Sequence, residues 1–95
     1  MTSQVKEVKL EKEFYKKLGM RSSAEELFKK FENDTSSKIV MDFDNVEFMS
    51  RSFAQEYVYQ KHKSNMKIEE KNMSGFVKEM YNIVSDDYQD YISNK

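Results

Sequence analysis

Polar side chains with reactive groups gather in one stretch of the chain, between an apolar run and the start of a predicted helix. The apolar run covers residues 39–43. The polar residues in and after it are Asp42, Asp44, Asn45, Ser50, Arg51 and Ser52. Asp42 has neither a paired acid nor a nucleophile, so we interpret it as a hydrogen-bond acceptor in a turn and not as a catalytic group. We therefore expect no catalytic residue here and predict a non-enzymatic binding role.

The order of residues in this stretch predicts a strand, a tight loop and a helix. Ser52 and Gln55 have capping-box spacing, so we expect Ser52 to cap a helix that runs to about His62. Ser50 is less well explained by capping and is the better candidate to face a partner. In open α/β sheets, binding surfaces lie at the carboxyl ends of the strands. The predicted partner-binding residues are Asp44, Asn45, Ser50, Arg51, Asn72 and Ser74.

The N-terminal segment carries two competing patterns. Val8 and Leu10 alternate with charged residues, which favours a strand over about residues 4–10. Leu10, Phe14 and Leu18 also fit the spacing of one helix face. We expect the strand, followed by an irregular or short helical link.

Helix caps and periodicity predict the remaining elements. Ser22 or Ser23, with a glutamate three residues later, makes a capping box before apolar residues at helical spacing. A short polar strand begins at Met66, and its charges suit a sheet edge. A helix follows from Ser74, and Ser85 with two aspartates caps a separate last helix. The apolar stripe of the helix from Ser74 is Phe76, Met80, Tyr81 and Val84. We expect it to face the core, with the alternative that its end forms a groove for a partner.

These elements give the order β-α-β-α-β-α-α, which predicts an α/β fold. Helices connect parallel strands, so we expect one small, open, mainly parallel sheet flanked by helices. The 95 residues make a single domain, 1–95, because no proline-rich linker or repeat divides them. Hydrophobic residues make up 38% of the chain and aromatics 14%, which supplies a core despite 35% charged residues.

Composition argues against several functional classes. The chain has no cysteine and a single histidine, His62, so we expect no metal site and no cofactor. A net charge of -1 gives no overall field for nucleic acid or an anionic membrane, and glutamates interrupt the lysine clusters at 29–30 and 61–63. No apolar run approaches the ~20 residues that span a bilayer, and the first residues lack a signal-peptide core. We expect a cytoplasmic protein.

Three segments carry a resemblance to a known family: GMRSSA at 19–24, IVMDFDNVEF at 39–48 and SFAQE at 52–56. The chain resembles the STAS-like domain of unknown function over about residues 19–84. STAS domains are α/β modules that act mainly as binding partners in bacterial regulation. The resemblance therefore implies a regulatory protein-interaction module, with a protein partner such as a regulatory kinase or ATPase.

The resemblance also bears on phosphorylation. Some STAS domains are switched at a helix-start serine in a loop that reads Asp-Ser-Ser-Gly. Alignment of that loop places Ser50 on the Asp, Arg51 on the acceptor serine and Ser52 on the second serine. The acceptor position is not a serine here, so a kinase would have to accept the shifted target Ser50 or Ser52. A phosphate there would meet a helix N-terminus and Arg51.

Two alternatives to a protein partner remain open. The first is a small-ligand or nucleotide-binding module, in which Arg21 and the start of the helix at Ser52 hold an anion. Arg21 could instead bridge to Asp42 or Asp44. The second is homo-oligomerisation through the outer strand or through the last helix, with Tyr88, Tyr91 and Ile92.

Overall fold

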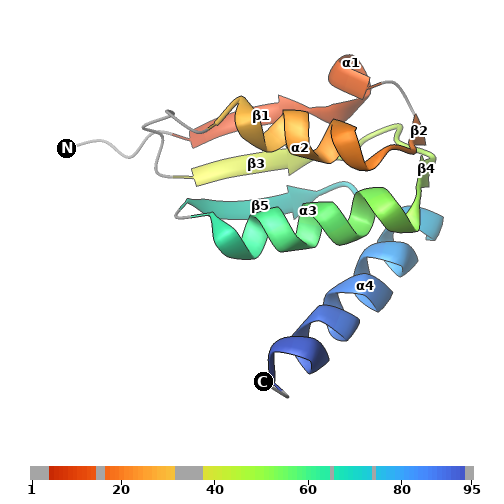
Figure 1. The fold of residues 1–95 in the computed structure, drawn as a ribbon. Coiled ribbons are helices and arrows are strands. Elements are labelled where there is room, and N and C mark those ends of the chain that lie inside the picture. The colour runs from red at the N-terminus through yellow and green to blue at the C-terminus, as the bar shows by residue number, and fades with distance from the viewer. Residues whose placement is uncertain (1–4, 15–16, 32–37, 65, 74, 94–95) are drawn as a thin grey trace.

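The computed structural model describes residues 5–14, 17–31, 38–64, 66–73 and 75–93 (Figure 1). Its elements in chain order are β1 (Val5–Lys9), α1 (Leu10–Phe14), β2 (Lys17–Leu18), α2 (Arg21–Lys29), β3 (Lys38–Asp42), β4 (Phe48–Met49), α3 (Arg51–Lys63), β5 (Lys67–Lys71) and α4 (Gly75–Ser93). The expected strand and short helical link of the N-terminal segment are confirmed as β1 and α1, whereas Leu18 lies in β2 and does not share a helix with Leu10 and Phe14.

The main sheet has three parallel strands in the order β1-β3-β5. The register places Val8 of β1 beside Met41 of β3, and Met41 beside Glu70 of β5. The carboxyl ends of all three strands therefore lie together at one end of the sheet. The predicted α/β fold with an open, mainly parallel sheet is confirmed, and β5 lies at a sheet edge as predicted.

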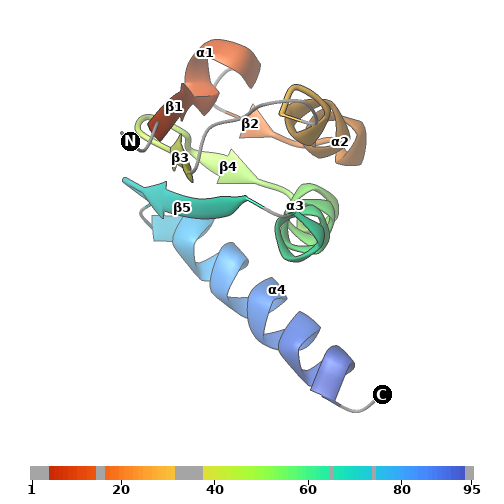
Figure 2. The same cartoon turned by 90° about the vertical axis from the view of Figure 1, so that its left-hand side faces the viewer.

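The helices α2 and α3 lie side by side on one face of this sheet (Figure 2). Each has an apolar stripe that is buried, with Leu27 in α2 and Phe53 in α3 both 0% exposed. Burial of these stripes against the inward side chains Ile39 and Met41 is the main force that holds the layers together. The helix α4 crosses below them and packs against α3 and β4.

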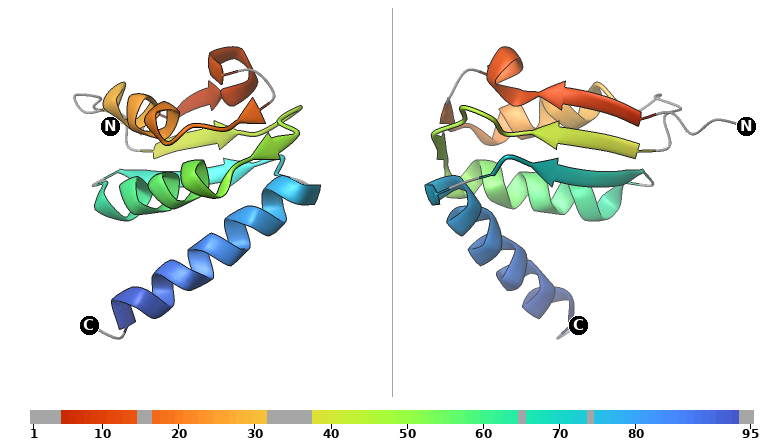
Figure 3. Two further views of the ribbon diagram at one scale, coloured as in Figure 1. Left: turned by 45° about the vertical axis from the view of Figure 1, so that its right-hand side comes forward. Right: turned by 180° about the vertical axis from the view of Figure 1, so that it is seen from behind.

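The opposite face of the sheet has no helix over it among the described residues, as the view from behind shows (Figure 3). Its side chains are mostly charged and pair across strands. Lys38 Nζ lies 3.1 Å from Glu69 Oε1, and Lys71 Nζ lies 2.6 Å from Glu7 Oε2. The burial of Ile39 and Met41 in β3, beside the partly exposed Lys38 and Val40, thus matches a sheet with one covered face and one open face.

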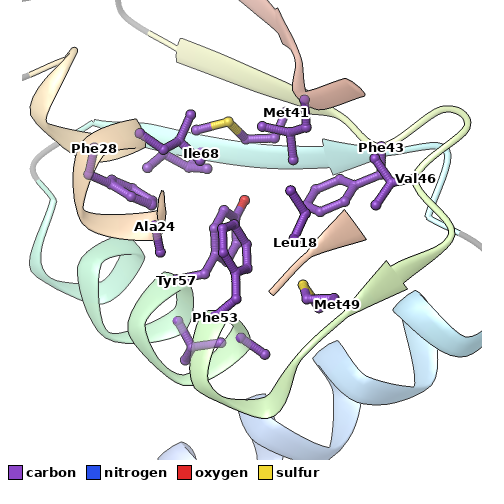
Figure 4. Packing of buried hydrophobic residues seen from close by; sticks show 14 of the residues in the cluster. Leu18, Ala24, Phe28, Met41, Phe43, Val46, Met49, Phe53, Tyr57 and Ile68 are labelled. Carbon is purple, nitrogen blue, oxygen red and sulfur yellow. The ribbon is translucent and has the colours of Figure 1, made fainter. Parts of the chain in front are cut away.

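Tyr57 of α3 lies at the centre of the core (Figure 4). Its ring is fully buried and contacts those of Phe28, Phe43 and Phe53, with centroid distances of 5.4, 6.0 and 6.2 Å. These rings come from α2, from the residue after β3 and from α3 itself. The aromatic content of the sequence therefore supplies the contact that joins the helical layer to the strand ends.

The structure differs from the predicted elements in three places. β2 and β4 form a separate two-residue parallel pair that periodicity is too short to reveal. The helix α2 begins at Arg21, before both predicted cap serines, and its N-cap Met20 makes no side-chain cap bond. The predicted break at Ser85 is absent, because α4 runs unbroken to Ser93 with no glycine or proline after Gly75 to end it.

Candidate functional site: the strand-end surface

Asp42, the last residue of β3, joins the ends of all three strands. Its side chain is 3% exposed. Oδ1 accepts hydrogen bonds from the backbone N–H of Asp44 and from Nδ2 of Asn72, both at 2.9 Å. Oδ2 accepts one from Lys9 Nζ at 3.3 Å. Lys9 ends β1 and Asn72 follows β5, so this one carboxylate connects the ends of all three strands. Asp42 is therefore a hydrogen-bond acceptor for a turn, as the sequence predicted.

The protonation of Asp42 follows from these contacts. Burial by itself would raise the pKa of this carboxyl, but the hydrogen bonds from Asn72, the Asp44 N–H and Lys9 outweigh it and lower the pKa below its ordinary value. The group is therefore ionised at neutral pH and its oxygens are already occupied by donors. Such a carboxylate is suited to holding loops in place and poorly suited to accepting a substrate proton.

Two asparagines shape the loops at this edge. Asn45 and Asn72 have φ angles of 65° and 62°, in the left-handed region that asparagine tolerates better than most residues. Asn45 Nδ2 also donates to Glu11 Oε1 at 3.3 Å. Both residues are exposed. The predicted partner-binding residues Asp44, Asn45 and Asn72 are thus brought together around Asp42.

Ser50 is the N-cap of α3, which corrects the prediction that Ser52 caps this helix. Ser50 Oγ accepts a hydrogen bond from the N–H of Phe53 at 3.0 Å and donates one to the C=O of Gly19 at 3.0 Å. Its backbone N–H donates to the C=O of Leu18 at 2.8 Å. The helix starts two residues earlier than expected because the β2–β4 pair places Ser50 at its end. Ser52 is left exposed in the first turn.

The two arginines proposed for this region lie in ion pairs. Arg51 Nη2 contacts Asp87 Oδ2 of α4 at 2.9 Å, with both side chains more than half exposed. Arg21 Nε lies 3.4 Å from Glu56 Oε1 of α3. This pair replaces the bridge to Asp42 or Asp44 that was one alternative for Arg21. A carboxylate therefore already occupies the place beside Arg21 that an anionic ligand would take. The anion site at Arg21 stays a prediction.

Two aromatic residues at this end of the sheet were not among the predicted partner-binding residues. The rings of Phe48 in β4 and Phe76 in α4 stack with a centroid distance of 5.5 Å and an interplanar angle of 10°. They are 37% and 47% exposed, so the expectation that Phe76 faces the core is wrong. Val77 and Val84 centre the buried face of α4, and Phe76 lies about 100° around the helix from Val77. This offset from Val77 is the feature of the sequence that could have indicated that Phe76 lies outside the buried face of the helix.

The remaining predicted residues lie elsewhere or outside the described part of the chain. Ser74 is outside the described residues. In the last helix, Tyr88 packs against the ring of His62 with a centroid distance of 4.7 Å, while Tyr91 and Ile92 are 59% and 40% exposed. Self-association through this helix stays a prediction.

No relative assigns a chemistry to this surface. Within the described ranges, no cluster of His, Cys, Asp and Glu could hold a metal ion, and no helix has the length and apolar character to cross a bilayer. Models of known families, curated proteins and solved structures all fail to match the chain.

Proposed function

We propose that this chain is a non-enzymatic regulatory module that binds a partner protein through the strand-end surface. We define this surface by the predicted residues and the aromatic pair: Asp44, Asn45, Phe48, Ser50, Arg51, Asn72 and Phe76. The observation that carries the proposal is the stacked, exposed pair of Phe48 and Phe76 beside these polar groups.

The composition of this surface resembles that of protein interfaces. Aromatic residues and arginine are enriched at the centres of such interfaces, while the rim is polar. Here Phe48 and Phe76 supply the aromatic area, and Arg51 lies three residues beyond Phe48 at the start of α3. The asparagines 45 and 72 add exposed amides at the loops.

The rigidity of the surface also supports binding. Asp42 holds both strand-end loops, and the Ser50 cap holds the start of α3. A surface already fixed in its bound geometry loses less conformational entropy when a partner docks. These contacts therefore favour a preformed recognition site over one that orders on binding.

The regulatory part of the proposal comes from the resemblance to STAS domains. It implies a protein partner such as a regulatory kinase or ATPase. Of the two candidate serines, Ser52 is the better acceptor for a phosphate, because its side chain is exposed while the hydroxyl of Ser50 makes the cap. A phosphate on Ser52 would lie in the first turn of α3, where the helix dipole favours negative charge.

Site-specific photo-crosslinking tests the proposal. A photoreactive phenylalanine analogue at position 48 is expected to crosslink a partner in cells, whereas the same analogue at position 59 is not. Tyr59 is the matched control, because it is an aromatic residue of α3 with 44% exposure and lies outside the strand-end surface.

The captured partner is then purified and titrated against variants of this protein. Phe48→Ala and Phe76→Ala are expected to weaken binding by about tenfold or more, as truncation of interface anchors does, while Tyr59→Ala leaves affinity unchanged. Circular dichroism confirms that each variant is folded. Equal affinity for all three variants would remove the strand-end surface as the binding site.

A further inference from the structure

The helix α4 carries a second apolar face besides its buried one. Val77 and Val84 mark the buried face, and the main contacts of the helix are with α3 and β4. Phe76 and Ile83 are 47% and 51% exposed, and Met80 between them is half-buried. Their spacing of four and three residues places these three side chains on one side of the helix. We call Phe76, Met80 and Ile83 the α4 stripe.

The α4 stripe continues the strand-end surface. Phe76 belongs to both, because its ring stacks on that of Phe48 at the start of α4. From there the helix runs away from the sheet, as Figures 1 and 2 both show. Ile83 lies about 10 Å further along the helix axis than Phe76. A partner that contacts the aromatic pair therefore has about two helical turns of apolar surface beside it.

The charged side chains that adjoin the α4 stripe are acidic. Glu79, Asp86 and Asp90 each lie within about 60° of Ile83 around the helix. All three are exposed, and their side chains form no ion pair or hydrogen bond with another described residue. We call these three residues the acidic flank.

The nearby cations do not balance the acidic flank. Lys78 is the only lysine of α4 and lies on the opposite side of the helix from the stripe. In the neighbouring α3, Arg51 is paired with Asp87 and Lys61 with Glu70. The negative charge beside the apolar stripe is therefore available to a partner.

The stability of α4 does not account for the acidic flank. Asp90 lies in the last turn of the helix, which contains no basic residue. The partial negative charge at a helix C-terminus disfavours a carboxylate there, and aspartate is a weak helix former. Asp90 therefore does not stabilise the helix, and its position beside an apolar stripe suits contact with a cationic molecule.

We propose that the α4 stripe binds a basic amphipathic helix of the partner protein. The apolar face of that helix packs on the stripe, and its lysines or arginines pair with the acidic flank. Charge selects this occupant over a second copy of the chain, because a two-fold pairing of α4 would bring the acidic flank against itself. The inference rests on the proposed function and names the chemistry of the partner at one end of that surface.

Fluorescence anisotropy with two synthetic peptides tests the charge. The first is a labelled amphipathic peptide of leucine and lysine, about four helical turns long, titrated with the full chain. The second has glutamate in place of each lysine and is expected not to bind. Glu79→Gln/Asp90→Asn should weaken binding of the lysine peptide about tenfold. The matched control Glu25→Gln/Glu26→Gln makes the same change in net charge on exposed residues of α2 and should bind as the wild type does.

A substitution in the stripe tests the apolar contact. Ile83→Ala is expected to weaken binding of the lysine peptide about tenfold, whereas Val5→Ala, at an aliphatic residue of β1 with 57% exposure, leaves it unchanged. Circular dichroism confirms that each variant is folded. Equal binding of both peptides, equal effects of a variant and its control, or no binding of the lysine peptide would overturn the inference. A dimer in sedimentation that Ile83→Ala dissociates would assign the stripe to a second copy instead.

The partner captured by crosslinking at position 48 separates this inference from the proposed function. Ile83→Ala and Glu79→Gln/Asp90→Asn should weaken the affinity of that partner as they weaken that of the lysine peptide. If only Phe48→Ala and Phe76→Ala do so, the strand-end surface stands and the basic helix is ruled out. If neither phenylalanine matters, the proposed function itself is wrong.

Discussion

Two largely buried carboxylates on neighbouring strands, Asp42 of β3 and Glu70 of β5, serve different layers of the molecule. The donors to Asp42 come from the strand ends and the loop that follows β3. The donors to Glu70 come from α3: Tyr57 OH at 2.7 Å and Lys61 Nζ at 3.0 Å. The carboxylate of Asp42 therefore holds the loops at the strand ends, whereas that of Glu70 joins the helical layer to the sheet.

The Glu70 cluster reaches further into the structure. Lys61 Nζ also donates to Tyr81 OH of α4 at 2.8 Å, so the cluster links β5, α3 and α4. Burial alone would lower the pKa of Lys61, but its hydrogen bonds to Tyr81 and Glu70 raise it. Burial and the neighbouring Glu70 raise the pKa of Tyr57 well above its ordinary value. Lys61 thus stays charged and Tyr57 neutral at physiological pH, as the cluster requires.

Removal of Glu70 is expected to have the largest effect on stability. Glu70→Ala leaves the Tyr57 hydroxyl and the half-buried Lys61 ammonium without their acceptor, which costs about 3 kcal/mol of unfolding free energy. Urea unfolding at neutral pH measures the change. Glu69→Ala is the control, because Glu69 is next in the chain but lies on the open face, and its loss should barely move the midpoint. Equal effects of the two variants would contradict the distinction between the layers.

Removal of Asp42 is expected to cost less and to act on the loops. Asp42→Ala should lower the free energy of unfolding by about 2 kcal/mol, because three donors lose their shared acceptor. Amide exchange at Asn45 and Asn72 should become faster. Asp44→Ala keeps the backbone N–H that binds Asp42 and should change neither quantity. Unchanged exchange in Asp42→Ala would show that the carboxylate does not hold the loops.

The helix cap at the strand-end surface is expected to be worth about 1 kcal/mol. Ser50→Ala removes the bond to the Phe53 N–H, so it should destabilise the protein by that amount. Ser52→Ala should leave the urea midpoint close to that of the wild type. The reverse ranking would restore Ser52 as the cap.

The smallest effect is the pH dependence that comes from Asp42. A carboxyl whose pKa is lower in the folded state stabilises the fold above its unfolded pKa, about 3.9, and this contribution is lost as the pH falls through the folded value. The stability difference between wild type and Asp42→Asn should therefore shrink below about pH 4. Urea midpoints of both proteins at neutral and acidic pH give the difference, and a gap that widens on acidification would contradict the assignment.

Local patterns in the sequence predicted the main elements because each carries its own signal. The run at 39–43 became β3, and the apolar spacing around Phe53 and Tyr57 became α3. Local patterns did not identify the N-cap of α3, because Ser50 and Ser52 both precede residues at helical spacing. The choice between the two serines depended on the β2–β4 pair, which joins residues about 30 positions apart and has no periodicity of its own.

The candidate site shows the same division. The polar residues at the strand ends could be predicted, because parallel connections place the carboxyl ends of all three strands at one edge. The ion-pair partners of Arg21 and Arg51 could not be predicted. Glu56 and Asp87 lie on other helices, and many other acidic residues in the sequence were equally available.

By itself, the sequence determined an α/β chain with a central apolar strand, amphipathic helices and a polar stretch after that strand, since these depend on the order of neighbouring residues. Only the tertiary structure decided that Phe48 and Phe76 stack in the open and that Arg51 of α3 pairs with Asp87 of α4. Such features arise where elements distant in the chain pack together. The free energy of that packing depends on several segments at once, so no single segment predicts it.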